Sequence, residues 1–452
     1  MTPRSSLVLE AAEFVTALTR ETIPPSIWEK ARRALLHNMA VAMAGSTLAQ
    51  TALEWGRRRS PAATGARVLH LGSRVGAADA AFVNACIMHA RAQDDIHLPS
   101  LSHFGAAAVP AALAIGESDD LSGEDLIVAL VAGYEVAAWI GEGVAAQSTT
   151  NGFRASGIYG VFAAAAAASR LMALECDEVA HALAIASSFA SGTNQTWLGG
   201  TEEYQFQVGA ASRNGVEASL IAAAGGSGSP DALEGAAGFY RAFLGTVPDA
   251  PDATTLGQQW RIRDVTFKPY PVCALLQAPI EEAIVLRRCQ GRDVVVDRAT
   301  LTLSPVEAAY PGTREKGPFI AHSAALMSAA FCLSVALGEG KFEASDLLRF
   351  DEPQLLERAQ HVTVVADADL APREFRLRAS FTDGRAAGTD FSPTPATFNW
   401  PQDELERRVL SLADEFPDWC DANSLISAIA RIEDMRIADL VDVCLQPSLE
   451  RL

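Results

Sequence analysis

One short stretch of this 452-residue chain gathers side chains that could move a proton. Residues 89–103 hold the pair Asp94 and Asp95 and three of the eight histidines, His89, His97 and His103. An aspartate beside a histidine can orient the imidazole for general acid or base work. Apolar, alanine-rich segments flank this stretch on both sides, which predicts a polar loop that opens into a cavity between buried helices. The alternative is that these residues cap helices and lie on the surface.

The same residue types could also ligate a metal ion, because histidine and aspartate are common zinc ligands. However, the chain contains no H-x-x-x-H or H-E-x-x-H pattern. Its seven cysteines include no C-x-x-C pair, which argues against an iron–sulfur cluster. We therefore expect no metal at this loop.

A second polar stretch, residues 151–160, places Arg154 and Tyr159 among glycines ahead of an alanine-rich helix. Glycine allows close approach of the backbone to a ligand. A helix N-terminus beside an arginine is a suitable place for a carboxylate. The alternative is a glycine turn with a purely structural role.

A third stretch, residues 267–273, contains one of only four lysines in the chain, Lys268. Two prolines flank Tyr270 and hold the backbone extended. The stretch lies where a helical half gives way to a mixed half, a common location for a site. The alternatives are a connector that carries a surface lysine and, for Cys273, a small buried thiol rather than a nucleophile.

The composition excludes several classes of protein. A net charge of −19 argues against nucleic acid and anionic membrane surfaces as partners. Ungrouped cysteines are typical of a reducing compartment, and the first residues lack the apolar core of a signal peptide. The longest alanine-rich run is about half of what a membrane span needs. We expect a cytoplasmic protein.

The pattern of apolar residues predicts a mainly α fold with two domains. Residues 1–262 and 398–452 form a discontinuous all-helical domain, because periodic apolar segments with few aromatics suit closely packed helices. Residues 263–397 form a smaller α+β domain, with strands at 299–304, 361–366 and 374–381 and a helix at 322–337. The alanine-rich segments near 163–174 and 182–192 are expected at the centre of the helical domain.

Three helix starts are predicted from capping residues. Ser26 with Glu29 should form a capping box, Ser122 should cap a helix that follows it, and Asp177 should cap a helix over 178–190. After Trp400 the chain should return to helix over 402–413, 422–431 and 437–444.

The chain resembles the MmgE/PrpD family along nearly its whole length. Residues 81–117 carry N-x-x-x-x-H, D-D-x-H and H-x-G-A-A-x-x-P-A-A-L-A in order. Further matches are Gly133-Tyr134-Glu135-Val136, residues 152–160, residues 209–215 and Lys268-Pro269-Tyr270-Pro271. The family includes 2-methylcitrate dehydratase, cis-aconitate decarboxylase and iminodisuccinate epimerase. The resemblance implies a large all-helical domain, a smaller α+β lid with the site between them, a small polycarboxylate substrate, a homodimer and no cofactor.

The sequence departs from the family's site pattern at several positions. The motif D-x-D-D-T of the dehydratase and decarboxylase branches becomes Ala92-Gln93-Asp94-Asp95-Ile96. By our alignment Tyr204 replaces a family lysine, and Cys273 stands where the decarboxylase branch has a histidine. His103 and Lys268 are kept. These departures argue against cis-aconitate decarboxylase and weaken the assignment as 2-methylcitrate dehydratase.

The family's reactions make or quench a carbanion next to a carboxylate, which requires a base and a cation that stabilises the enediolate. We expect His103 to be the base or acid and Asp95 to orient it, with Lys268 and Arg154 on the carboxylate. Tyr159 and Tyr204 are candidates for a second acid or base. The remaining substrate-binding candidates are Asp94, His97, Tyr270, Cys273 and Arg213.

Three functions stay open. The first is a hydro-lyase of the 2-methylcitrate dehydratase kind. The second is an epimerase or isomerase of an amino- or imino-polycarboxylate, of the iminodisuccinate kind. The third is a family member that binds a polycarboxylate without turning it over.

Overall fold

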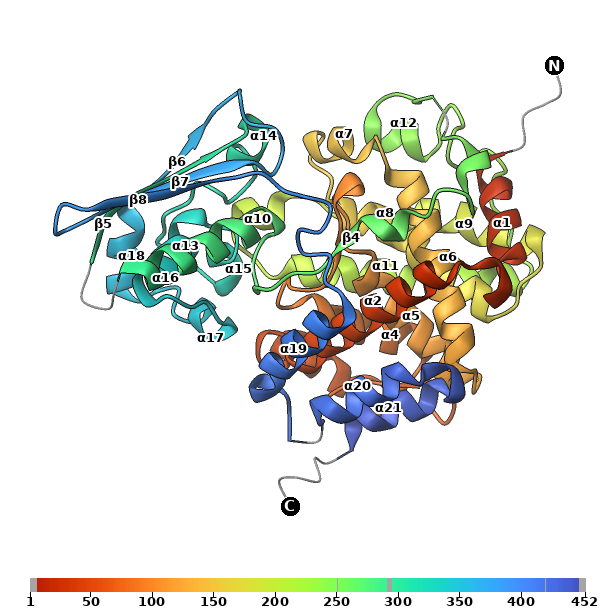
Figure 1. The fold of residues 1–452 in the computed structure, drawn as a ribbon. Coiled ribbons are helices and arrows are strands. Elements are labelled where there is room, and N and C mark those ends of the chain that lie inside the picture. The colour runs from red at the N-terminus through yellow and green to blue at the C-terminus, as the bar shows by residue number, and fades with distance from the viewer. Residues whose placement is uncertain (1–5, 250, 291–294, 419, 447–452) are drawn as a thin grey trace. The chain divides into compact units, whose positions relative to one another are not determined.

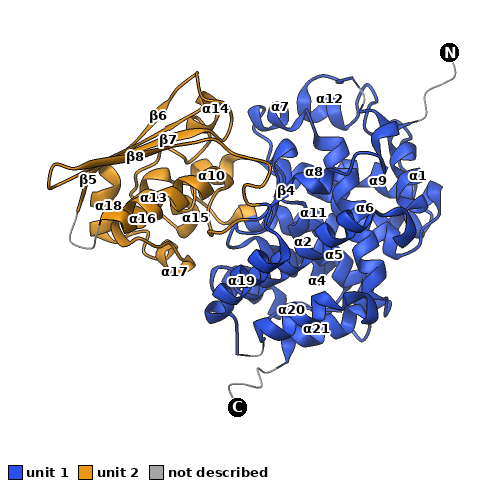
Figure 2. Ribbon diagram, in the orientation of Figure 1, with its two compact units in different colours: residues 1–193, 205–267, 399–452 blue, residues 194–204, 268–398 orange. Residues whose placement is uncertain are grey.

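The computed structural model describes residues 6–249, 251–290, 295–418 and 420–446. The chain divides into two compact units, coloured in Figure 2. Unit 1 comprises Met1–Thr193, Gln205–Phe267 and Asn399–Leu452, and unit 2 comprises Asn194–Tyr204 and Lys268–Phe398. Each unit is described below by itself.

The expected mainly α fold with a smaller α+β part is confirmed. Unit 1 is built from helices (Figure 1). They are α1 Leu7–Ala17, α2 Pro25–Met43, α3 Gln50–Arg57, α4 Ala77–His89, α5 Phe104–Ser118, α6 Gly123–Gly141, α7 Ala145–Thr150, α8 Ala155–Leu171, α9 Cys176–Phe189, nearly all of α11 Glu203–Ala223, α12 Phe239–Leu244, α19 Gln402–Leu412, α20 Ala422–Ala430 and α21 Ile437–Leu445. It also holds two small antiparallel pairs, β1 Ala66–Arg67 with β2 Arg74–Val75, and β3 Ile96–His97 with β4 Val265–Thr266.

The core of unit 1 is a group of tightly packed helices, in which α8 contacts α5, α6 and α9. The alanines of α8 from 163 to 168 are fully buried, as expected. On α6, a Cβ at Gly133 would lie 2.6 Å from the Ala163 carbonyl oxygen, so the two backbones meet at a distance that only glycine allows. The second alanine-rich segment, α9, alternates buried and half-exposed residues, so it covers the core rather than filling it.

Of the three predicted caps, one is confirmed. Ser122 accepts a hydrogen bond from the Asp125 backbone N–H at 3.1 Å. The capping box at Ser26 is wrong, because α2 begins at Pro25, a residue that fits the first helical position since it needs no N–H partner. The cap at Asp177 is also wrong, because the N-cap is Glu175, two residues earlier, which forms a capping box with Glu178.

Unit 2 contains a four-stranded sheet in the order β6-β5-β7-β8. Its strands are β5 Val296–Leu303, β6 Val362–Ala366, β7 Phe375–Phe381 and β8 Ala386–Phe391, with β5 and β6 parallel and the other pairs antiparallel. Its helices are α10 Gln195–Gly199, α13 Gln277–Gln290, α14 Pro305–Ala308, α15 His322–Ala325, α16 Ala329–Glu339, α17 Ala344–Leu347 and α18 Pro353–Gln360. The sheet is packed against α13 and α16.

The strand predictions agree with β5, β6 and β7 to within a few residues, but β8 was missed. β8 is an edge strand with small and exposed residues, so it lacks the apolar alternation that marks a strand in sequence. The helix expected at 322–337 is split into α15 and α16, because Ser328 caps a new helix by accepting from the Phe331 N–H.

The unit boundaries differ from the predicted domain limits in three places, one of which is the single residue Phe398, which belongs to unit 2. Residues 263–267 stay in unit 1, where β4 pairs with β3. Residues 194–204 join unit 2, where the Ser323 hydroxyl donates to the Gly200 carbonyl at 2.7 Å and Tyr204 packs on Trp197.

Among the described helices, none is both long enough and apolar enough to cross a bilayer. All seven cysteines lie in the described part of the chain, and none of them forms a disulfide.

Candidate active site

The loop that carries most of the predicted site residues connects α4 to α5. α4 ends at His89, and the chain then turns through Ala92, which has a left-handed φ of 47°. β3 follows and pairs with β4, with Ile96 opposite Thr266 and His97 opposite Val265. His103 comes directly before the first residue of α5, and its backbone N–H donates to Ser156 Oγ on α8 at 3.2 Å. Pairing of β3 with β4 therefore fixes the middle of the loop, and the hydrogen bond to α8 fixes its C-terminal end.

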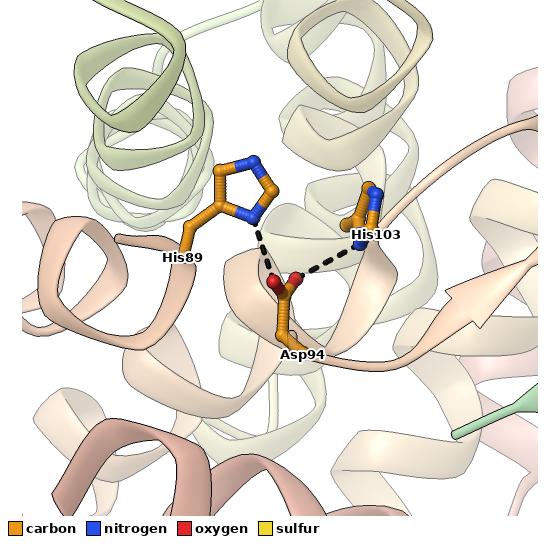
Figure 3. Close-up of side chains that lie close together, drawn as sticks. All are labelled: His89, Asp94 and His103. Atoms are coloured by element: carbon orange, nitrogen blue, oxygen red, sulfur yellow. Dashed lines mark hydrogen bonds and ion pairs between the residues drawn. The ribbon is translucent and has the colours of Figure 1, made fainter. Parts of the chain in front are cut away.

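At the centre of this loop Asp94 lies between two histidines (Figure 3). Its Oδ1 is 2.8 Å from His89 Nδ1, and its Oδ2 is 3.0 Å from His103 Nδ1. The Asp94 and His89 side chains are almost fully buried, whereas that of His103 keeps 11% of its surface exposed. His103 is thus the member of the cluster that solvent can reach.

Arg154 contacts this cluster on the side of His89. Its Nη2 lies 2.5 Å from His89 Nε2, and its Nη1 lies 3.5 Å from Gln207 Oε1 on α11. Arg154 is only 4% exposed. The helix N-terminus of α8, next to Arg154, and the loop between α4 and α5 therefore meet in unit 1, so two of the three predicted polar stretches come together.

The carboxylate of Asp95 points away from His103. It accepts hydrogen bonds from Asn38 Nδ2 at 3.0 Å, from the Tyr134 hydroxyl at 2.5 Å and from the Gly105 N–H at 3.2 Å. Only the backbone carbonyl of Asp95 contacts His103, 2.8 Å from Nδ1. The contact that we expected of the Asp95 carboxylate is therefore made by Asp94, because successive side chains of this loop face opposite directions.

Burial and charge shift the pKa values of the cluster in different directions. Burial lowers the pKa of His89 to about 3, with the Arg154 cation acting in the same direction. The two histidines beside Asp94 hold the pKa of that carboxyl well below its usual range, although burial opposes them. Burial raises the pKa of Asp95 to about 6. At neutral pH the cluster thus combines an ionised Asp94 with a neutral His89.

Three other predicted residues of unit 1 have different surroundings. His97 Nδ1 lies 2.6 Å from Ser100 Oγ, and burial together with Arg261 lowers its pKa to about 3. Tyr159 contacts Ser148 Oγ at 3.1 Å, and burial raises its pKa to about 12. The Arg213 guanidinium lies over the Phe82 ring at 5.7 Å. These contacts give Tyr159 and Arg213 partners outside the histidine cluster.

The remaining predicted residues belong to unit 2. Lys268 is buried. The Tyr270 backbone is fixed by the Gln277 side chain, which accepts from its N–H and donates to its carbonyl, both at 3.0 Å. Burial raises the pKa of the Cys273 thiol, which suits a structural thiol better than a nucleophile. The Tyr204 hydroxyl lies 3.4 Å from His322 Nε2.

Sequence reasoning did not assign roles to three residues that contact Asp94 or Asp95. His89, at the end of α4, was part of the polar stretch but was not among the predicted site residues. Asn38 is a polar residue in the apolar part of α2, and Tyr134 lies in one of the family-like motifs. A buried polar residue on an apolar helix is the signal that could have identified Asn38, because such groups need partners.

His89, Asp94 and His103 also offer ligand atoms that lie within 4.8 Å of one another, as a metal site requires. Each nitrogen–oxygen distance to Asp94 is that of a hydrogen bond, however, and the Arg154 guanidinium contacts the same His89 ring. The positive charge of Arg154 beside His89 disfavours the binding of a metal cation at the same place. We interpret the cluster as a hydrogen-bonded network.

Comparison with known proteins identifies the family of the chain. Residues 10–250 match the MmgE/PrpD N-terminal domain, which includes the whole histidine cluster. The chain belongs to the MmgE/PrpD family. It is 27% identical to a cis-aconitate decarboxylase of Aspergillus terreus, over 96% of this chain and 93% of that protein. It is 25% identical to the cis-aconitate decarboxylase of Homo sapiens, over 81% of this chain and 79% of that protein.

Proposed function

We propose that this MmgE/PrpD family member is a lyase, and more narrowly a hydro-lyase, that acts on a small polycarboxylate by taking a proton from a carbon next to a carboxylate. The observation that carries the proposal is the environment of His103 Nδ1, which faces Asp94 Oδ2 at 3.0 Å and the Asp95 carbonyl at 2.8 Å. Two acceptors at Nδ1 require a proton there, so the lone pair of the neutral ring is on Nε2. His103 is therefore prepared to act as a base.

The reaction would proceed by transfer of the carbon-bound proton to His103 Nε2. The electron pair left behind forms an enediolate with the neighbouring carboxylate and then the carbon–carbon double bond, as the β-hydroxyl leaves as water with a proton from a second acid, for which Tyr159 and Tyr204 are the candidates. The ionised Asp94 stabilises the imidazolium that forms. Lys268 is our candidate for the cation on the substrate carboxylate, on the family resemblance and its place among only four lysines.

The relatives named cis-aconitate decarboxylase support a lyase with a polycarboxylate substrate. A hydro-lyase fits this chain better than a decarboxylase for two reasons. A neutral imidazole with its lone pair on Nε2 is suited to take a proton from carbon. Cys273 also stands where the decarboxylase branch has a histidine.

The experiment is a screen of hydroxy- and unsaturated polycarboxylates, including 2-methylcitrate and cis-aconitate, followed by ultraviolet absorption of the alkene, release of carbon dioxide and deuterium incorporation in deuterium oxide. We expect alkene formation, without release of carbon dioxide. Carbon dioxide would establish a decarboxylase instead. Deuterium exchange at the α-carbon without an alkene would establish an epimerase of the iminodisuccinate kind.

The variants His103→Ala and Lys268→Ala test the residues. We expect His103→Ala to lower kcat by about 10²–10⁴-fold and Lys268→Ala to raise KM. Matched controls are His361→Ala and Lys341→Ala, which remove an exposed histidine and an exposed lysine of unit 2. If neither site variant changes turnover, the assignment of the site is wrong. If no polycarboxylate is turned over but one raises Tm, the protein is a binding member of the family.

We also propose a homodimer and a cytoplasmic location, on the family resemblance and the ungrouped cysteines. Analytical ultracentrifugation at several protein concentrations tests the first, and a monomer at all of them would contradict it.

A further inference from the structure

A series of three polar contacts leads from Arg154 to His103. Arg154 Nη2 is 2.5 Å from His89 Nε2, and His89 Nδ1 is 2.8 Å from Asp94 Oδ1. Asp94 Oδ2 is 3.0 Å from His103 Nδ1, which also lies 2.8 Å from the Asp95 carbonyl. All the residues in this series of contacts lie in unit 1.

The donors and acceptors in this chain determine where each proton lies. A guanidinium can only donate, so His89 Nε2 accepts from Arg154 and carries the lone pair. The proton of the His89 ring is then on Nδ1 and is donated to Asp94. A carboxylate and a carbonyl can only accept, so the His103 proton is also on Nδ1. This assignment is compatible with all these contacts: the His103 proton is hydrogen-bonded to the Asp95 carbonyl, and Asp94 Oδ2 lies within ion-pair distance of the same nitrogen.

The charges of the residues in this series of contacts also balance. Asp94 is a fully buried anion, and such a group is unstable unless a cation or hydrogen-bond donors compensate it. The Arg154 cation supplies the opposite charge across a neutral His89, whose pKa of about 3 keeps it uncharged. Without Arg154 and His89, protonation of Asp94 would become easier, and a protonated Asp94 would no longer stabilise a positive His103.

We propose that Arg154 and His89 are positioning residues that act on His103 through Asp94, and that Arg154 is not the ligand of the substrate carboxylate. They hold Asp94 ionised and aligned, which fixes the Nδ1–H tautomer of His103 and stabilises its protonated form. This inference changes the role that the sequence indicated for Arg154. Its kinetic consequence rests on the proposed function, whereas its structural consequence does not.

The first test needs no substrate. Nuclear magnetic resonance of protein with ¹⁵N-labelled histidine reports which ring nitrogen is protonated, and spectra of His89→Gln and His103→Gln assign the two signals. We expect His89 and His103 to be protonated on Nδ1 and unprotonated on Nε2 at pH 7.5. In Arg154→Met we expect His89 to take up a second proton at higher pH than in the wild type, because the Arg154 cation no longer lowers its pKa, and His103 to titrate at lower pH. A wild-type His103 protonated on Nε2 would overturn the proposal.

Conservative variants separate positioning from loss of folding. His89→Asn keeps an amide donor in the place of Nδ1–H and should preserve the His103 tautomer, whereas His89→Leu should not. Arg154→Lys keeps a cationic donor and should restore at least half of the wild-type His103 signal. Circular dichroism and Tm identify variants that fail to fold. For these positions the conservative variants His89→Asn and Arg154→Lys then show whether the residue has a positioning role. Unchanged histidine spectra in folded His89→Leu would contradict the proposal.

The second test is kinetic. If Arg154 acts through His89, Arg154→Met lowers kcat by at least tenfold, leaves KM within about threefold and moves the acid limb of the pH profile. A rise in KM of tenfold or more with kcat unchanged would assign Arg154 to the substrate instead. If the wild-type protein turns over no polycarboxylate, the proposed function fails. The resonance data still show whether Arg154 and His89 act on His103 through Asp94. If the purified protein contained stoichiometric metal, and if chelation removed the metal together with the activity, the cluster would be a metal site. That result would overturn the proposed positioning role of Arg154 and His89.

Discussion

Asp94 Oδ2 lies 3.0 Å from His103 Nδ1, while the carboxylate of the adjacent Asp95 faces Asn38 and Tyr134. Two neighbouring aspartates of one loop thus have separate surroundings. Asp94 faces His103, whereas Asp95 fastens the loop to α2 and α6. The following predictions test this division and the elements that support it.

Asp94→Asn should lower kcat by about 10²–10⁴-fold, within the usual range for general acid–base groups. The amide removes the negative charge that stabilises protonated His103, so the acid limb of the pH profile of kcat/KM should move to lower pH. Steady-state kinetics from pH 5 to 9 measures both effects. An acid limb that stays in place would mean that Asp94 does not act on the base.

Asp95 should make stability depend on pH in a direction opposite to that of most carboxylates. Its pKa is raised from an ordinary 3.8 to about 6 by burial, so the folded state binds a proton more tightly than the unfolded state. Its contribution is fully present below pH 3.8 and is lost as the pH rises through about 6. Relative to Asp95→Asn, the wild-type free energy of unfolding should therefore fall between pH 4 and pH 6. Asp351→Asn, at an exposed position, controls for general effects of acid.

Gly105→Ala should disrupt the loop. A Cβ at Gly105 would lie 2.7 Å from Asp95 Oδ1 and closer still to Asn38 Nδ2 and the Tyr134 hydroxyl oxygen. Overpacking of this kind costs about 1–3 kcal/mol, measured by urea unfolding, and should reduce kcat as well. Gly76→Ala is the matched control, because no atom lies within 4 Å of its Cβ and its φ of −54° suits any residue. Equal effects of the two variants would contradict the packing argument.

Lys30 should give a second pH dependence, on the alkaline side. Its Nζ donates to the Val265 carbonyl at 2.5 Å and to Asn399 Oδ1 at 2.7 Å, which ties α2 to β4 and to the segment that returns to unit 1. Burial lowers its pKa from an ordinary 10.5 to about 7, aided by Arg33 and opposed by Asp95 and Asp264. Between these two pH values the unfolded state binds more protons, so stability should rise with pH.

The measurement is the free energy of unfolding of wild type minus that of Lys30→Met, from pH 7 to pH 10. It should increase by up to about 1.4 kcal/mol per pH unit, on top of a constant loss from the unpaired carbonyl. Lys341→Met is the control, because Lys341 is exposed and its pKa is raised by Glu343. A flat difference for Lys30→Met would mean that the lysine is not desolvated as the structure indicates.

Much of the fold was predictable from local sequence patterns. The strands β5, β6 and β7 and the helices α19, α20 and α21 lie where apolar alternation or helical periodicity placed them. These patterns survive because each element buries one face against its neighbours. β8 was not predicted and the capping of α2 was predicted wrongly, since an edge strand has no buried stripe and a proline can begin a helix without a side-chain cap.

The sequence by itself determined the family, the polar stretch at residues 89–103 and His103 as the candidate base, because residue types and spacing are enough for a motif. Only the tertiary structure decided which aspartate faces His103 and that Arg154 contacts His89. Both depend on the pairing of β3 with β4 and on the packing of α8 beside the loop. Contacts between segments so far apart in the sequence leave no local pattern. The direction in which a side chain of a loop points depends on the elements that pack against the loop.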